Sequence, residues 1–328
     1  MDRMTVAADA LAAQYAALGK LDGVSIDLEL TSVCDAVCGF CPREFMPDKK
    51  RFISMEVVER LAHELRHRRI TGVVLCGIGE STLHPQLNEI VRTLAGTGTK
   101  VEMTTHGGAR MDTQRFETLI AHGLSGFSFS VNAATAATHQ NVMRLKDFDR
   151  TVANLREIID LRNRSYRDVA LHVSFVVCEA NQHEVEAFVE CWRQYRAVRI
   201  WLHPLNNRNG LLSPGMKPVD VRRFVALYGD DPQIVVDVFG HLDDEPKMCK
   251  IAKTMIFISV DGTVRLCAMD YRRATSYGNL LERSLSDMHR AKLSKYLRGE
   301  MNAFCGTCDF CPSEIRGERN ALHVLRVV

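Results

Sequence analysis

Three cysteines near the N-terminus have a spacing that suits a metal cluster. Cys34, Cys38 and Cys41 are arranged as C-x3-C-x2-C directly after a short apolar run. Soft thiolate ligands select iron–sulfur chemistry, and a [4Fe–4S] cluster normally takes four of them. Three ligands therefore leave one iron open for a small chelating molecule. A zinc site and three unrelated thiols are the alternatives, but structural zinc sites usually combine one C-x2-C pair with a second pair.

A second group of five cysteines lies in the C-terminal part of the chain. Asp261-Gly262 separates two short apolar runs and predicts a tight β-hairpin, which Cys267 closes. Because one cluster takes four ligands, one thiol is left over. One economical ligand set leaves Cys249 free, and a zinc ribbon is the alternative. That set consists of Cys267, Cys305, Cys308 and Cys311, the last three following a predicted helix over residues 285–297.

Composition narrows the class of protein. The 328 residues carry a net charge of +2 with basic and acidic residues interspersed, so we expect no nucleic-acid partner. No apolar run is long enough to cross a bilayer and the first residues lack the layout of a secretory signal, so we expect a cytoplasmic protein without a membrane partner. In that reducing compartment clustered cysteines indicate metal ligands. Cys76, Cys178 and Cys191 are isolated and are expected to be inert core residues.

Alternating strand and helix patterns must position these residues. Six strand–helix units between residues 25 and 203 predict an α/β fold with a parallel sheet covered by helices. The first strand leads directly into the first cysteine loop, and in such folds active residues gather at the C-terminal ends of strands. We expect an N-terminal helix over residues 1–22, an α/β domain over 23–212, a linker region over 213–234 and a small C-terminal domain over 235–328.

Glycines and polar side chains follow several of the predicted strands. Gly77 and Gly79 would let the backbone approach a ligand closely, and Glu80 offers an acceptor for an ammonium group. A guanidinium farther along would bind a carboxylate through two hydrogen bonds. The candidates at and beyond the fourth strand are Ser130, Asn132 and Arg144.

The first cysteine loop, with Phe40 as an aromatic residue just before its last cysteine, resembles the signature of the radical S-adenosylmethionine (SAM) superfamily. The segment that ends at Glu80 is similar to the family's G-x-G-E-P segment, with Ser81 in place of proline, and His106 stands where the family commonly has Asn. The resemblance implies a (β/α)6 partial TIM barrel and SAM bound to the open iron. It also implies that Glu80 holds the amino group of SAM, while Ser130, Asn132 and Arg144 meet its ribose or carboxylate.

The C-terminal cysteine group resembles the truncated SPASM appendage called a twitch domain, which implies a second, auxiliary [4Fe–4S] cluster. The spacing of related twitch dehydrogenases favours a different ligand set, in which Cys311 is the free thiol. That set consists of Cys249, Cys267, Cys305 and Cys308. The sequence leaves both sets open.

In its architecture and its surplus cysteine, the chain resembles the radical SAM epimerases of aminoglycoside antibiotic biosynthesis. This resemblance implies inversion of one aminosugar carbon, with Cys249 returning a hydrogen atom and an electron donor such as flavodoxin or ferredoxin. The acidic residues 243–245 just before Cys249 would attract a polycationic aminoglycoside. A twitch-type dehydrogenase of an aminocyclitol or another sugar-like alcohol, a peptide maturase and a non-catalytic metal-binding protein are the alternatives.

Overall fold

The computed structural model describes residues 10, 21, 23–206, 212, 216–237, 250–298, 300, 305 and 308. Nearly all of the predicted N-terminal helix lies outside these residues, as do Cys249, Cys311 and the acidic residues 243–245. Among the described residues, no helix combines the length and the apolar character that a membrane span requires.

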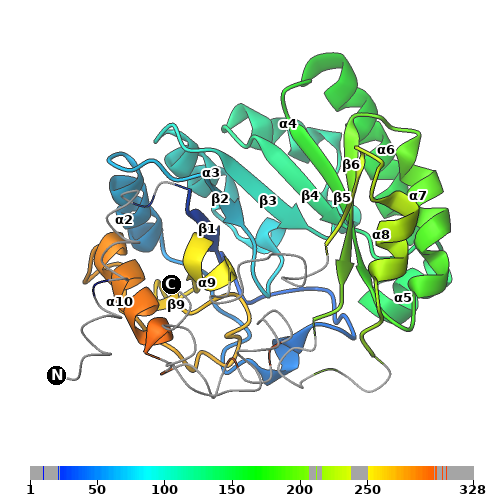
Figure 1. Ribbon diagram of the computed structural model, residues 1–328. Helices are drawn as coiled ribbons and strands as arrows, with labels where there is room; N and C mark the ends of the chain where they lie inside the picture. The colour runs from blue at the N-terminus through cyan, green and yellow to red at the C-terminus, as the bar shows by residue number, and fades with distance from the viewer. Residues whose placement is uncertain are drawn as a thin grey trace.

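One sheet of nine strands runs through the described part of the chain, in the order β7-β6-β5-β4-β3-β2-β1-β8-β9 (Figure 1). Neighbouring strands are parallel throughout, except that β9 is antiparallel to β8. The predicted α/β fold with a parallel sheet is confirmed. The strands are β1 (Ser25–Leu28), β2 (Gly72–Leu75), β3 (Val101–Thr105), β4 (Gly126–Ser130), β5 (Ala170–Val177), β6 (Val198–Pro204), β7 (Ile234–Val236), β8 (Met255–Ile258) and β9 (Val264–Arg265).

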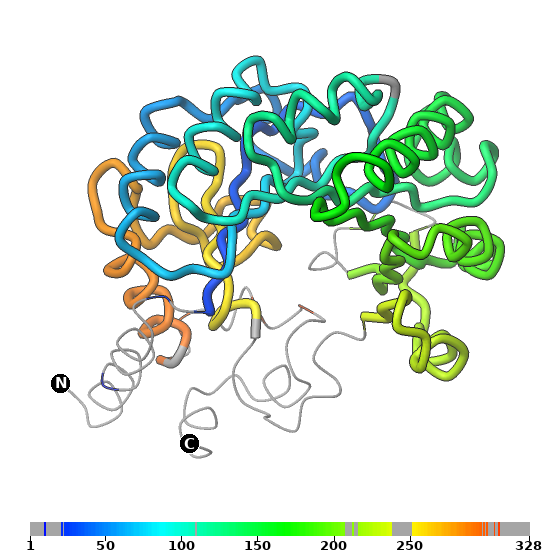
Figure 2. Tube along the Cα trace, turned by 90° about the horizontal axis from the view of Figure 1, so that it is seen from above, coloured from blue at the N-terminus to red at the C-terminus, as the bar shows by residue number. Residues whose placement is uncertain are grey.

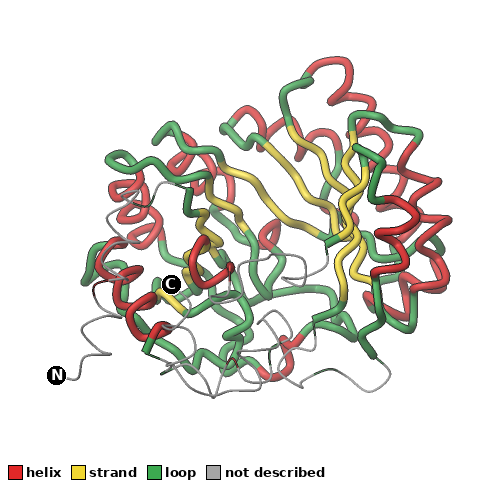
Figure 3. The backbone as a smooth tube through the Cα atoms, viewed as in Figure 1, coloured by secondary structure: helices red, strands yellow, loops and turns green. Residues whose placement is uncertain are grey.

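Helices cover the outer side of this sheet, as the colouring by secondary structure shows (Figure 3). Seen from above, the chain forms an open arch, with α10 near one end and α8 near the other (Figure 2). This arrangement is that of a partial barrel. The helices are α2 (Met55–Leu65), α3 (Leu87–Ala95), α4 (Thr113–Ala121), α5 (Ala136–Met143), α6 (Phe148–Ser165), α7 (Val185–Arg193), α8 (Arg222–Tyr228), α9 (Lys250–Thr254) and α10 (Leu285–Leu297).

Alternation along each strand determines which side chains face the helices. In β6, Ile200 and Leu202 are fully buried in the same core cluster as Trp192 of α7. In β1, Ile26 and Leu28 are likewise fully buried. Because successive side chains point to opposite faces of a strand, the intervening residues face the inner side of the arch.

The region that the sequence predicts as a linker contains regular structure. Residues 222–228 form α8, and Ile234 begins β7, which pairs with β6 in parallel. Both elements are short, so their periodic patterns are too brief to be distinguished from a loop.

The C-terminal part joins the barrel's own sheet. The predicted hairpin at Asp261-Gly262 is confirmed, since β8 and β9 pair in antiparallel fashion on either side of it. Gly262 has φ +79, and a Cβ there would lie 2.9 Å from Val57 of α2. A glycine therefore satisfies both the turn and the close approach of the helix. Through β8, which pairs with β1, the hairpin lies beside the strand that leads into the first cysteine loop.

Candidate functional site

The loop that carries Cys34, Cys38 and Cys41 begins just after β1 and is held by backbone contacts on both sides. Gly39 N donates to Val142 O of α5 at 2.9 Å, and Cys41 N donates to Cys38 O at 3.0 Å. The Arg43 side chain donates to Ser32 O at 3.0 Å. The loop is thus anchored between β1 and the end of α5 at the C-terminal edge of the sheet, as the sequence predicts.

The three thiols of this loop lie near one another. Burial raises the pKa of Cys38 well above its ordinary value, and the neighbouring Cys41 and Cys34 raise it further because adjacent thiolates repel each other. None of the three forms a disulfide. A positively charged metal cluster would relieve this repulsion, so the donor set fits an iron–sulfur cluster. As the ligand roles of these thiols rest on chemistry and spacing, they stay predictions.

The glycines after β2 serve the packing of this loop. A Cβ on Gly79 would lie 2.0 Å from Thr31 O, on the backbone that leads into Cys34. Gly77 has φ +149, and a Cβ there would lie 2.8 Å from the side chain of Glu29. Glu80 N then donates to Val33 O at 2.8 Å. The close approach that the sequence suggests is therefore present, and it is an approach to the cysteine loop itself.

Glu80 is buried beneath the cysteine loop, and its carboxylate accepts hydrogen bonds from protein groups. Oε1 accepts from the hydroxyls of Thr82 and Thr105, both at 2.7 Å, and from Thr82 N at 3.1 Å. Oε2 accepts from His106 N at 3.1 Å. Glu80 thus ties the loop after β2 to the end of β3. Its predicted contact with the amino group of SAM stays a prediction.

His106 and Asp35 form an ion pair beside Cys34 that the sequence did not indicate as a site. Their Nε2 and Oδ1 atoms lie 2.8 Å apart, and ligand atoms of Cys34, Asp35 and His106 all lie within 4.8 Å of one another. The hydrogen bond from His106 lowers the pKa of Asp35 to about 2. Although burial opposes its charge, hydrogen bonds to Asp35 and Cys34 and the charge of Glu80 raise the pKa of His106 to about 11. The signal in the sequence was the unusual histidine after the third strand.

Met143 connects several of the predicted cofactor residues. Its Sδ lies 3.5 Å from Cys38 Sγ and accepts from Asn132 Nδ2 at 3.1 Å. Phe40 is buried in the same small apolar cluster. Arg144, the next residue, is exposed and ends α5 in the left-handed conformation at φ +59. Sequence reasoning missed Met143 because an apolar residue at the end of a helix carries no chemical signal.

The two predicted residues of β4 differ in their setting. Asn132 is buried with φ +60, and its Oδ1 accepts from Val176 N at 2.7 Å, which fastens the end of β4 to β5. Ser130 is partly buried on the inner face, with its hydroxyl 3.4 Å from that of Ser174. The hydroxyl of Ser130 therefore lies on the inner face, whereas the side chain of Asn132 serves the backbone, and the contacts of both residues with SAM stay predictions.

The inner face of the arch is polar, unlike the interior of a closed barrel, which branched aliphatic side chains fill. Asp27 and Cys76 are hydrogen-bonded to each other on this face. Burial raises the pKa of Asp27 to about 6 and that of Cys76 well above its ordinary value. Cys76 thus lies on the inner face and not in the main core, and its raised pKa keeps the thiol protonated, which agrees with the expectation that it is inert. Further polar inner-face residues are Glu102, Thr104, Ser128, His172, Ser174, Arg199, Trp201 and His203.

Thiols of the second cysteine group converge beneath α10. Cys308 N donates to Cys305 O at 3.0 Å, and both cysteines are buried in the main core. Burial raises the pKa of Tyr277, and the charges of Cys305, Asp270 and Cys267 raise it further. Cys267 and Cys305 therefore approach the same ring from different segments. The choice between Cys249 and Cys311 as the fourth ligand lies outside the described residues.

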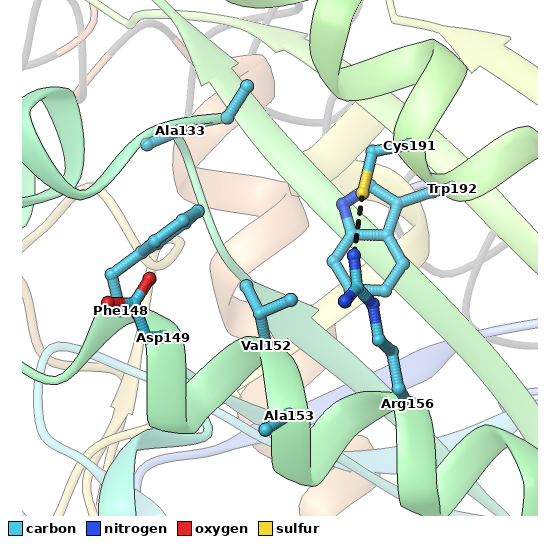
Figure 4. A pocket seen from close by; sticks show the side chains of 9 residues that line it. Ala133, Phe148, Asp149, Val152, Ala153, Arg156, Cys191 and Trp192 are labelled. Atoms are coloured by element: carbon cyan, nitrogen blue, oxygen red, sulfur yellow. Dashed lines mark hydrogen bonds between the residues drawn. The ribbon is translucent and has the colours of Figure 1, made fainter.

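A cavity of about 290 Å³ lies in the helical layer, between α6 and α7. Figure 4 shows Arg156 reaching toward Cys191, with its Nη2 at 3.9 Å from the sulfur. Phe148 and Val152 line the same cavity from α6. Since these elements cover the outer side of the sheet, the cavity is separate from the polar inner face.

The open parallel barrel, with one thiol group at the end of its first strand and a second beyond its last helix, defines an iron–sulfur protein of the SAM-dependent radical class. The chain belongs to the radical SAM superfamily, whose family model matches residues 28–191. The model of the SPASM family, described as an iron–sulfur cluster-binding domain, matches residues 249–312. The protein is therefore a radical SAM enzyme with a C-terminal cluster-binding region.

Curated relatives resemble the barrel part. The probable GTP 3′,8-cyclase of Saccharolobus islandicus is 32% identical over 164 residues, which cover 50% of this chain and 51% of that protein. The GTP 3′,8-cyclase of Synechococcus elongatus is 30% identical over 140 residues, which cover 41% of this chain and 42% of that protein. The chain thus spans about half the length of the first of these relatives and somewhat less of the second.

Solved structures share the fold over most of the chain. SuiB of Streptococcus suis, bound to precursor peptide SuiA, has a TM-score of 0.69 at 15% identity, covering 88% of this chain and 70% of that one. BtrN in complex with AdoMet and 2-DOIA has a TM-score of 0.53 at 16% identity, and the match covers 85% of this chain and 86% of that one. The structure of anSMEcpe with bound AdoMet has a TM-score of 0.59 at 13% identity, and the match covers 83% of this chain and 82% of that one. At these identities the likeness shows the fold alone.

Proposed function

We propose that this chain is a radical SAM epimerase that inverts one aminosugar carbon of an aminoglycoside, with neomycin C to neomycin B as the reaction that its sequence resemblance implies. The observation that carries the proposal is the surplus thiol, since five cysteines stand in a region where one cluster takes four. The convergence of Cys267, Cys305 and Cys308 supports a shared cluster there.

The proposed cofactors are SAM and two [4Fe–4S] clusters, one held by Cys34, Cys38 and Cys41 and one by the C-terminal group. When bound and reduced, the first cluster with SAM would supply the radical chemistry that removes a hydrogen atom from an unactivated carbon. The protein contributes placement and charge. On the inner face the carboxylates of Asp27 and Glu102 outnumber the guanidinium of Arg199, which favours a cationic substrate over an anionic one.

The proposed second half of the reaction is hydrogen return from Cys249. The S–H bond breaks, the new C–H bond forms on the opposite face of the sugar carbon, and a thiyl radical remains on sulfur. One electron and one proton would restore the thiol, and a flavodoxin or ferredoxin would be the source of the electron, which an auxiliary cluster held by the C-terminal cysteines could relay. Such donors and intact clusters belong to a reducing compartment, so we place the enzyme in the cytoplasm.

The mass of the product tests this proposal against its alternative. Reconstituted enzyme, SAM, dithionite and neomycin C are incubated in deuterium oxide under anaerobic conditions. An epimerase yields an isomer that carries one solvent deuterium, since thiol protons exchange with water. A twitch-type dehydrogenase would instead yield a product lighter by two hydrogens, and that result would overturn the epimerase. GTP serves as a second substrate because of the cyclase relatives, and its consumption would also contradict the proposal.

A further inference from the structure

Two aromatic side chains of β6 face the inner side of the arch. Trp201 and His203 alternate with Ile200 and Leu202, which are fully buried on the helical side. The parallel register places Ser174 of β5 beside Trp201. Both aromatic residues are only partly buried, so they lie on the open inner face and not in the main core.

The aromatic rings form a continuous ladder across β5 and β6. The centroids of Trp201 and His203 lie 5.6 Å apart with an interplanar angle of 23°. His172 of β5 continues the ladder, with its ring 5.9 Å from that of Trp201. The indole Nε1 of Trp201 is buried, and no group among the described residues accepts its hydrogen bond. The ring of Trp201 is partly exposed, so its face is available to a ligand that has an apolar surface.

A carboxylate stands at the end of this ladder. Asp237 follows β7, and its Oδ2 lies 3.4 Å from His203 Nδ1. The side chains of His203 and Asp237 are 31% and 37% exposed, so both reach the surface of the molecule. An ammonium group placed here would meet a negative charge and the face of an aromatic ring together, the two interactions that bind cationic amines.

We propose that the ladder of His172, Trp201 and His203, with Asp237 at its end, is the platform that binds one amino-bearing ring of a cationic sugar substrate. This inference rests on the proposed function, because it assigns that substrate a place at the lateral end of the barrel. The apolar C–H face of the ring stacks on Trp201 and His203, and its ammonium lies against Asp237.

Intrinsic fluorescence provides a direct test, because the chain has two tryptophans and the other, Trp192, is 1% exposed in the helical layer. In the Trp192→Phe background, reconstituted holoenzyme is titrated with neomycin and, separately, with an uncharged trisaccharide. The platform predicts a saturable change in Trp201 emission with the aminoglycoside alone. An equal response to the uncharged sugar, or no response to either, would overturn the inference.

Binding of neomycin to variants, measured by calorimetry, tests the same point without the fluorophore. Trp201→Ala should raise the dissociation constant at least about 10-fold, with Trp201→Phe between it and the wild type, while SAM binding is unchanged. Asp237→Asn should weaken binding most at low salt. Arg196→Ala, at an exposed position before β6, is the matched control. Unchanged affinity in Trp201→Ala would reject the platform even if the product is an epimer. Tight, Trp201-dependent binding with a product lighter by two hydrogens would keep the platform and reject the epimerase.

Discussion

His106 Nε2 lies 2.8 Å from Asp35 Oδ1, so the end of β3 is joined directly to the loop of the first cysteine group. Glu80 approaches the same ring nitrogen, with 3.5 Å between Oε2 and Nε2. This line of charged groups connects the ends of β2 and β3 to the residue next to Cys34. The loop that we expect to hold a cluster is therefore positioned by buried polar contacts as well as by its own backbone.

His106→Ala should loosen this loop. The change removes a charge-assisted hydrogen bond, so we expect a loss of about 1–3 kcal/mol in the free energy of unfolding. We also expect up to about four fewer iron atoms per reconstituted chain, the content of one [4Fe–4S] cluster. His106→Asn keeps a hydrogen-bond donor, so its stability and iron content should lie between those of His106→Ala and the wild type. His183→Ala, at an exposed histidine, is the control. Wild-type iron content and stability in His106→Ala would show that the pair does not position the loop.

Gly79→Ala should be far more disruptive than an ordinary glycine change. The new Cβ would lie 2.0 Å from Thr31 O, so the backbone before Cys34 must move. We expect a loss of about 2–4 kcal/mol and poor reconstitution of the first cluster. Gly98→Ala is the control, since its Cβ meets nothing within 4 Å and only its positive φ is strained, at about 1 kcal/mol. Equal melting temperatures for the two variants would contradict the packing role of Gly79.

Glu80→Gln separates a structural role from a cofactor role. The carboxylate accepts four hydrogen bonds from protein groups, and an amide nitrogen would face a donor at one of them. We therefore expect the melting temperature of the protein without SAM to fall, by the equivalent of about 1–3 kcal/mol. If Glu80 acted only on the SAM amino group, the SAM-free protein would melt as the wild type does, and only SAM affinity would drop.

Asp27→Asn should stabilise the protein at high pH. Burial raises the pKa of Asp27 from 3.8 to about 6, so the folded state binds the proton more tightly than the unfolded state. Tighter proton binding stabilises the folded state, fully so below pH 3.8. This stabilisation, up to about 3 kcal/mol, is lost as pH rises through 6. Urea unfolding at pH 5 and pH 8 measures the free energy of unfolding of both proteins. The value for Asp27→Asn, relative to that of the wild type, should be higher at pH 8 than at pH 5. An identical difference at both pH values would contradict the shift.

Much of the fold could be predicted from the sequence because its patterns are local. The strand before Cys34 and the turn at Asp261-Gly262 are specified by neighbouring residues, and both are where the sequence predicts them. The short strand β7 was missed because three residues give no period.

The site was predictable in its thiols and less so in their surroundings. The roles of Gly79 and Glu80 depend on segments about 25 to 50 residues away, which spacing along the chain does not reveal. The polar inner face was only partly foreseen. Trp201 alternates with aliphatic residues and is as apolar as they are, so the sequence does not tell which of the two sets faces the helices, and the burial of Ile200 and Leu202 in the structure decides it.

The proposed reaction depends on hydrogen return from Cys249, with Cys311 as a ligand of the auxiliary cluster. Two single variants distinguish these roles. Cys249→Ala and Cys311→Ala are each reconstituted and incubated with SAM, reductant and neomycin C, and 5′-deoxyadenosine and epimer are quantified together. We expect Cys249→Ala to keep both clusters and to form 5′-deoxyadenosine while the epimer is lost. Cys311→Ala should lose iron from the auxiliary cluster. Undiminished epimer from Cys249→Ala would contradict the account.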